Sequence, residues 1–195
     1  MLTFEPSRSQ LRTLKKNPDV TVRWQKPVLD AQRVAIGGES AGGNLAAVCC
    51  LLARDRSGPR ICHQWLDVPA TDGTFAQEGH RNVANGYLLD RSTIAEYLNT
   101  YIGPDVDPAD PMVSPLFAES HQDLPPAWIM SAEYDRLRGD ATAYADALSA
   151  AGVEVQHRRL AGHVHPSFAF TRLLPSAAAY ERDAIEALAA AFRAV

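Results

Sequence analysis

The chain has 195 residues, of which 46% are hydrophobic and 22% are charged, a composition typical of one globular domain with a sizeable core. Its formal net charge of −4 argues against nucleic-acid binding, and the absence of an apolar run as long as a membrane span or a signal-peptide core points to the cytoplasm. Residues 1–33 carry seven Lys or Arg and only three Asp or Glu. We therefore expect an atypical leader over 1–28, followed by the domain over 29–195.

From residue 33 onward, apolar runs alternate with helix-forming stretches, which predicts an α/β fold with a mostly parallel sheet and helices on both faces. Strands are expected over 33–38, 61–68, 127–132 and 153–160. Helices are expected over 44–56, 91–101, 139–151 and 176–194, the third of them closed by Gly152. Residues 70–90 have loop composition, and a lid-like insertion is expected over 70–115.

The junction between the first strand and the first helix carries the most informative motif. Residues 38–42 read Gly-Glu-Ser-Ala-Gly, the pattern of a nucleophile elbow. Such a turn holds the serine, here Ser40, in a strained backbone conformation with its hydroxyl exposed. Glycine is expected at Gly38 and Gly42 because side chains there would crowd the turn. The helix that follows directs its first N–H groups towards the reacting centre.

The cysteines indicate no special chemistry. Their number is odd, and two of them are adjacent on a predicted buried helix, so Cys49, Cys50 and Cys62 are interpreted as reduced packing residues. No spacing of Cys and His fits a metal site, so no metal is expected.

Candidates for the other catalytic residues follow the later strands. The chain order in this kind of fold is nucleophile, acid, base, with the acid and base on loops beyond strand ends. Asp135 lies three residues after the third predicted strand, and His165 lies five residues after the fourth. Glu133 and Asp140 are alternatives for the acid, and His163 is an alternative for the base.

These residues predict an acyl-enzyme mechanism. His165 would remove the proton of Ser40 as the hydroxyl attacks an acyl carbon, and would then protonate the leaving group. Asp135 would accept the other imidazole N–H and fix its tautomer. The backbone N–H of Ala41 would donate to the oxyanion, and water would hydrolyse the acyl-enzyme.

From about Leu29 to its end, the chain resembles the hormone-sensitive-lipase-like esterases, the α/β-hydrolase-3 group. The segments that carry the resemblance are 33–47, 69–72, 110–116, 124–127, 131–138 and 162–165. The resemblance implies a triad of Ser40, Asp135 and His165, and it favours His165 over His163 as the base. It also implies hydrolysis of small carboxylic esters, often with short acyl chains, without a cofactor.

The chain departs from the family pattern after both the acid and the base. After the acid the family tends to read Pro-Leu-Arg-Asp-Glu-Gly, whereas residues 136–141 read Arg-Leu-Arg-Gly-Asp-Ala, and Pro166 stands where the family favours glycine. A larger departure lies upstream, because no His-Gly-Gly-Gly segment precedes Ser40. In the family this segment supplies most of the oxyanion hole. We therefore expect an N-terminally truncated α/β hydrolase whose turnover is impaired, with Ala41 nearly alone as oxyanion donor.

Truncation would also leave the strand at 33–38 with an open edge, which favours self-association unless residues 19–24 cover it as a substitute strand. Two other functions stay open at this point. The chain could be a catalytically inactive fragment or interaction protein that keeps the triad residues. It could also be an amidase or serine peptidase on the same fold.

Overall fold

The computed structural model describes residues 30, 33–83, 85–103 and 105–194. The chain divides into two units, Met1–Asp30 and Ala31–Val195, and every element below belongs to the second. The leader expected over 1–28 and the substitute strand expected over 19–24 lie outside the described residues, so both stay predictions.

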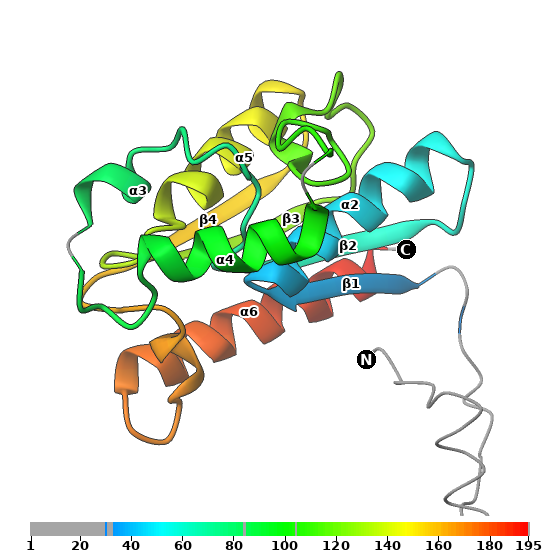
Figure 1. Cartoon of the computed structure of the whole chain (residues 1–195). Coiled ribbons are helices and arrows are strands. Elements are labelled where there is room, and N and C mark those ends of the chain that lie inside the picture. Colours follow the sequence, from blue (N-terminus) through cyan, green and yellow to red (C-terminus); the bar gives the residue numbers. More distant parts are fainter. Residues whose placement is uncertain (1–29, 31–32, 84, 104, 195) are drawn as a thin grey trace, which may run out of the picture. The chain divides into compact units, whose positions relative to one another are not determined.

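The centre of the described unit is a sheet of four parallel strands, as the sequence predicts (Figure 1). They are β1 (Val34–Glu39), β2 (Ile61–Asp67), β3 (Ala127–Ala132) and β4 (Val155–Leu160), and their order in the sheet is their order in the chain. Within the described residues, β1 pairs with β2 alone, so it forms one edge of the sheet. Self-association through this edge stays a prediction.

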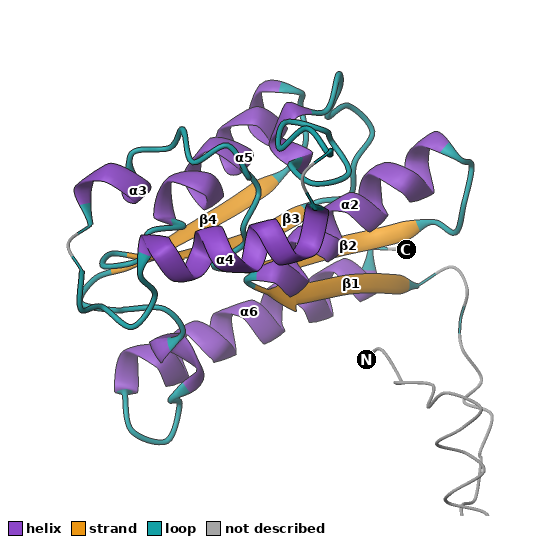
Figure 2. Ribbon diagram, viewed as in Figure 1, coloured by secondary structure: helices purple, strands orange, loops and turns teal. Residues whose placement is uncertain are grey.

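Helices cover both faces of the sheet, which confirms the expected α/β layering (Figure 2). Helices α2 (Ala41–Asp55) and α5 (Arg138–Ala150) lie on one face, and α6 (Pro175–Arg193) lies on the other. The α2 side of the core is built from small residues such as Ala46 and Ala47, which let the helix approach the sheet closely.

The two layers of the core have different chemistry. Beneath α2 and α5, apolar side chains such as Leu66, Ile129 and Leu148 pack together. On the other face, Trp128, Met130 and Phe168 pack with Tyr180 of α6. The indole N–H of Trp128 donates to the Tyr180 hydroxyl at 3.0 Å, so this layer includes polar contacts.

Two predicted elements need correction. The residues over 70–90 include a short helix, α3 (Gly79–Asn82), where loop composition predicted none. The helix predicted from residue 44 begins at Ala41, directly after Ser40, because the two glycines that suggest a turn lie inside its first turn. Helix α4 (Arg91–Ile102) and the 3₁₀ turns η1 (Pro115–Phe117) and η2 (Ser167–Ala169) complete the described elements.

The cysteines also differ in part from expectation. Cys50 and Cys62 are buried and free, whereas Cys49 is exposed, since adjacent residues on a helix point about 100° apart. Burial raises the pKa of the Cys50 thiol to about 12, so Cys50 stays protonated and inert.

Candidate active site

Ser40 occupies the turn between β1 and α2 in a backbone conformation that residues with side chains rarely adopt. Its φ is 56° and its ψ is −118°. The Ser40 N–H donates to the Asp67 carbonyl at the end of β2 at 2.8 Å, and the Ser40 carbonyl accepts from Asn44 N–H at 3.1 Å. Hydrogen bonds on both sides of the residue therefore hold the turn.

The glycines around this turn differ in how much space surrounds them. A Cβ on Gly38 would lie 2.2 Å from the Gly42 carbonyl oxygen, so a side chain cannot fit there. The crowding expected at Gly42 is wrong, because a Cβ there meets no atom of the described residues within 4 Å. Gly43 is the second crowded position, with a Cβ contact of 2.9 Å to Pro69.

Asp135 and His165 come together beyond the ends of β3 and β4. His165 Nδ1 lies 2.8 Å from Asp135 Oδ2. The other oxygen, Oδ1, accepts the Leu137 N–H at 3.0 Å, and Asp135 is 1% exposed. A buried carboxylate with these two partners is fixed in place and fixes the imidazole ring in turn.

The alternative residues have other partners. Glu133 Oε2 accepts the Gly162 N–H at 2.8 Å. Asp140 pairs with His80, with 3.1 Å between Oδ1 and Nε2. Both ring nitrogens of His163 are used by serine hydroxyls, at 2.8 Å to Ser176 and 2.9 Å to Ser167. None of the three contacts the Asp135–His165 pair by a hydrogen bond within the described part of the chain.

Ser40, Ala41 and His165 line one cavity of about 520 Å³. The remaining wall is mainly apolar, and much of it comes from the segment for which a lid was predicted. Besides Ala41, the apolar residues that line the cavity are Leu45, Ala70, Phe75, Leu89, Ile94, Tyr97, Leu98, Tyr101, Val113, Leu137 and Pro166. The cavity therefore suits an apolar substrate group beside a small polar centre.

Two backbone features bear on the polar end of this cavity. The Ala41 N–H donates to no acceptor among the described residues, as expected for the first residue of a helix. Asn44, which the sequence analysis passes over, donates to the carbonyl oxygens of Ala70 and Val113 at 2.6 and 2.7 Å. Asn44 thus connects α2 to two other segments that line the cavity. Both partners are distant in the chain, so no local sequence pattern predicts these contacts.

The end of β2 adds a polar cluster that the sequence analysis also misses. The Asp67 carboxylate accepts hydrogen bonds from the Tyr180 hydroxyl and, at 2.9 Å, from Trp65 Nε1. Burial raises the pKa of Asp67 from its ordinary 3.8 to about 6, although both hydrogen bonds oppose this shift. The same residue holds Ser40 through its backbone carbonyl.

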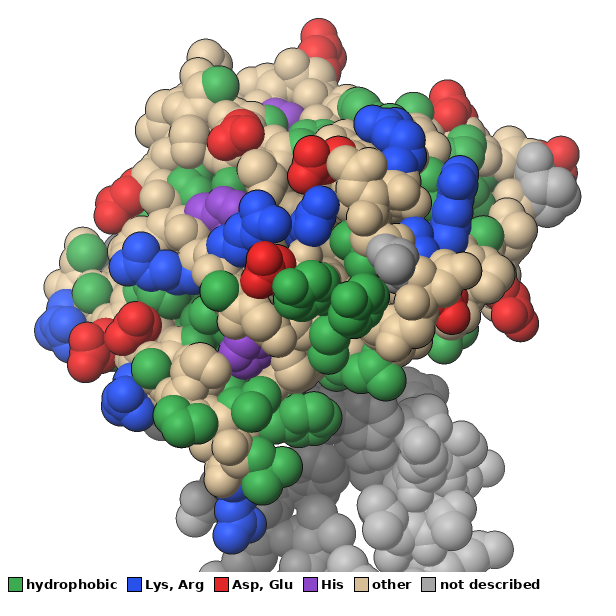
Figure 3. Space-filling model, turned by 90° about the vertical axis from the view of Figure 1, so that its left-hand side faces the viewer, with side chains coloured by type: hydrophobic (Ala, Val, Ile, Leu, Met, Phe, Trp, Pro, Cys, Tyr) green, Lys and Arg blue, Asp and Glu red, His purple; other side chains and the backbone are tan. Residues whose placement is uncertain are grey.

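The surface at which the strands end carries two kinds of side chain in neighbouring areas. Figure 3 views this face and shows hydrophobic side chains gathered beside a group of Arg side chains. Within the described residues there is no cluster of three or more potential metal ligands, and no helix there is both long and apolar enough to cross a membrane.

Comparisons with known proteins give the family context. A family described as "alpha/beta hydrolase fold" matches residues 3–169. The carboxylic ester hydrolase LipN of Mycobacterium tuberculosis is 44% identical over 163 residues, which cover 81% of this chain and 43% of that protein. An arylesterase of Saccharolobus solfataricus is 38% identical over 138 residues, which cover 70% of this chain and 45% of that protein.

Solved structures agree with these relatives. A bacterial heroin esterase superposes with a TM-score of 0.74 at 32% identity, covering 85% of this chain and 52% of that one. An esterase of Pyrobaculum calidifontis gives a TM-score of 0.75 at 32% identity, with the same coverage of 85% and 52%. The chain thus spans about half the length of the proteins that it matches.

Proposed function

Because this chain belongs to the alpha/beta hydrolase fold family, we propose that it is a serine hydrolase that cleaves small carboxylic esters with short acyl chains. The observation that carries the proposal is the pairing of His165 with a buried Asp135 at a cavity that also contains Ser40 on a strained turn. The relatives named above are ester hydrolases, which favours esters over amides as substrates.

In the proposed reaction, Ser40 Oγ attacks the ester carbonyl carbon while His165 Nε2 accepts the hydroxyl proton. Asp135 stabilises the imidazolium that results and keeps Nε2 directed at the serine. The tetrahedral intermediate then collapses, and His165 returns the proton to the departing alcohol oxygen. A water molecule repeats the sequence on the acyl-enzyme and releases the acid.

The N–H of Ala41, which has no acceptor among the residues that the structure describes, supports its proposed role as an oxyanion donor. It stands at the first position of α2, where the helix leaves its N–H groups unpaired and the dipole is positive. The apolar wall of the cavity would hold the acyl or alcohol group and keep water from the intermediate. This mechanism needs no cofactor. The cytoplasmic location and the lack of nucleic-acid binding stay predictions.

A fluorophosphonate probe tests the nucleophile directly. We expect the probe to label the purified chain and Ser40→Ala to abolish the labelling, because the probe reacts only with an activated serine hydroxyl. Ser92→Ala, on the first turn of α4, is the matched control and should be labelled like the wild type. Labelling that persists in Ser40→Ala would falsify the assignment.

A further inference from the structure

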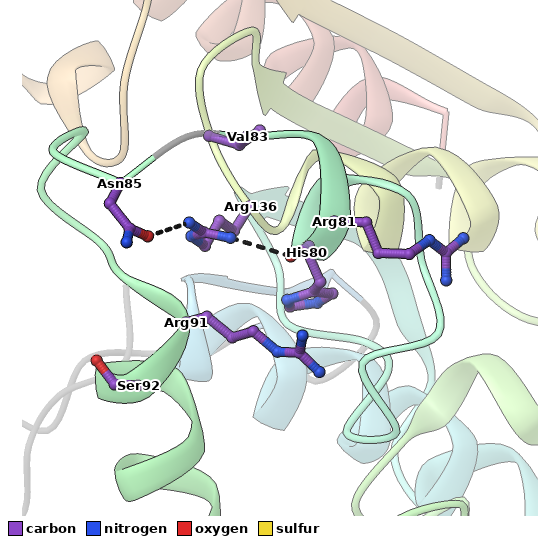
Figure 4. A pocket seen from close by; sticks show the side chains of 7 residues that line it. All are labelled: His80, Arg81, Val83, Asn85, Arg91, Ser92 and Arg136. Carbon is purple, nitrogen blue, oxygen red and sulfur yellow. Dashed lines mark hydrogen bonds between the residues drawn. The ribbon is translucent and has the colours of Figure 1, made fainter.

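A second cavity, of about 620 Å³, lies beside the turn that carries Asp135. Figure 4 shows its lining residues coming from α3, from the segment that follows it, from the start of α4 and from the turn after β3. Three of the lining residues are arginines, Arg81, Arg91 and Arg136, and His80 also lines the cavity. Among the described residues, no aspartate or glutamate lines this cavity, and its three arginines make the wall cationic.

Arg136 is the most informative of these residues, because it is only 5% exposed. It donates to the His80 carbonyl at 3.0 Å and to Asn85 Oδ1 at 2.6 Å, and both acceptors are neutral (Figure 4). Its Nε has no partner, and it forms no ion pair with a carboxylate of the described residues.

A buried guanidinium without a counter-charge is unfavourable, since burial removes its hydration and neutral acceptors restore only part of it. The nearest carboxylate in the sequence, that of Asp135, is already occupied by His165 and by the Leu137 N–H. The described residues therefore supply no anion to balance the charge of Arg136.

The neighbours of Arg136 favour the same ligand. His80 is 2% exposed, its Nε2 contacts Asp140, and its Nδ1 has no hydrogen-bond partner in the described part of the chain. The Arg91 guanidinium lies 5.8 Å from the centre of the Phe75 ring, a position that leaves its N–H groups free to donate. Arg81, by contrast, extends away from Arg136 in Figure 4 and donates to the Ala76 carbonyl.

We propose that this cavity binds a small oxyanion, a phosphate or carboxylate group, with Arg136 and Arg91 as its principal ligands. The planar guanidinium groups match the paired oxygens of either anion, and none of the described residues that line the site carries an acidic side chain to repel them. Arg136 stands where the family pattern favours proline. The proposal does not depend on the esterase function.

The test is a melting-temperature series on the full chain in increasing sodium phosphate or sodium malonate, with sodium chloride holding the ionic strength constant. We expect the melting temperature of the wild type to rise by about 3–6 °C when an anion reaches roughly ten times its Kd. A gain with phosphate alone identifies a phosphate ligand, and a gain with malonate alone identifies a carboxylate. A gain with both identifies a general oxyanion site.

Arg91→Gln and Arg136→Gln should each remove most of the gain. Arg182→Gln, at an exposed position on α6, makes the same change in charge elsewhere and should keep the gain in melting temperature. If Arg136→Gln does not fold, Arg91→Gln alone tests the proposal, because the Arg91 side chain is exposed and its replacement should leave folding intact. The proposal is overturned if neither anion stabilises the wild type, or if Arg91→Gln gains as much as Arg182→Gln.

Discussion

His163 and His165 lie two residues apart in the loop after β4, and their different hydrogen bonds indicate different roles. His163 gives both ring nitrogens to serine hydroxyls, whereas His165 pairs with Asp135 at the cavity that contains Ser40. A ring engaged on both sides has no nitrogen left to take a proton from the nucleophile. The local hydrogen bonds thus separate a structural histidine from a candidate base.

This contrast gives a matched pair of variants. We expect His165→Asn to slow fluorophosphonate labelling of Ser40 by about 10²–10⁴-fold, the usual contribution of a general base. His163→Asn should keep the labelling rate but lower the free energy of unfolding by about 1–3 kcal/mol, because buried hydroxyls lose their partners. Single-turnover labelling and urea unfolding measure the two effects. The reverse pattern would make His163 the base.

The glycines of the elbow provide a second pair. Gly38→Ala places a Cβ 2.2 Å from the Gly42 carbonyl, so we expect a loss of about 3 kcal/mol or more in the free energy of unfolding. Gly42→Ala has space and lies within α2, so it should stabilise the protein by about 0.5–1 kcal/mol. Urea unfolding of both variants tests this, and equal losses would contradict it.

At the scale of elements, the carboxyl end of β2 connects the nucleophile turn with helix α6. The Asp67 backbone holds Ser40, and the Asp67 side chain is bonded by Tyr180 of α6. The ion at this position is disfavoured by burial, so the pKa of Asp67 is about 6. The connection between the two elements therefore depends on pH.

The folded state holds the Asp67 proton more tightly than the unfolded chain does, so this group stabilises the fold at low pH and the effect is lost as pH rises from about 4 through about 6. Relative to the wild type, Asp67→Asn should gain about 1–3 kcal/mol in free energy of unfolding between pH 4 and pH 7. The exposed Asp183→Asn is the control and should show no such trend in urea unfolding. A trend of equal size in both variants would contradict the assignment.

The sequence predicts an element well where the element's own residue pattern determines its structure, and poorly where contacts with residues distant in the chain determine it. Strand β3 is predicted to the residue, because five of its six residues are apolar and the strand is buried along its whole length. Helix α3 escapes prediction because it is a single turn stabilised from outside, by the contact of His80 with Asp140 and of Arg136 with the His80 carbonyl. Neither partner is near in the chain.

At the scale of the whole molecule, the parallel order of the strands assembles the candidate site. Because β1, β3 and β4 end at the same edge of the sheet, residues 40, 135 and 165 meet there despite their separation in the chain. This rule limits the candidates to residues that follow the strand ends, and the family resemblance favours Asp135 and His165 among them. It cannot reveal Asn44 or the cationic cavity, which depend on how the segment from 70 to 115 folds over that edge.

The polar cluster at the end of β2 has an optical consequence. Trp65 donates to the Asp67 carboxylate, and Trp128 donates to the Tyr180 hydroxyl that bonds the same carboxylate. A charge that appears or disappears beside two indole rings shifts their emission. The intrinsic fluorescence of the protein should thus report the protonation state of Asp67, whose backbone holds Ser40. The binding of a ligand that disturbs this turn could then be followed without any added dye.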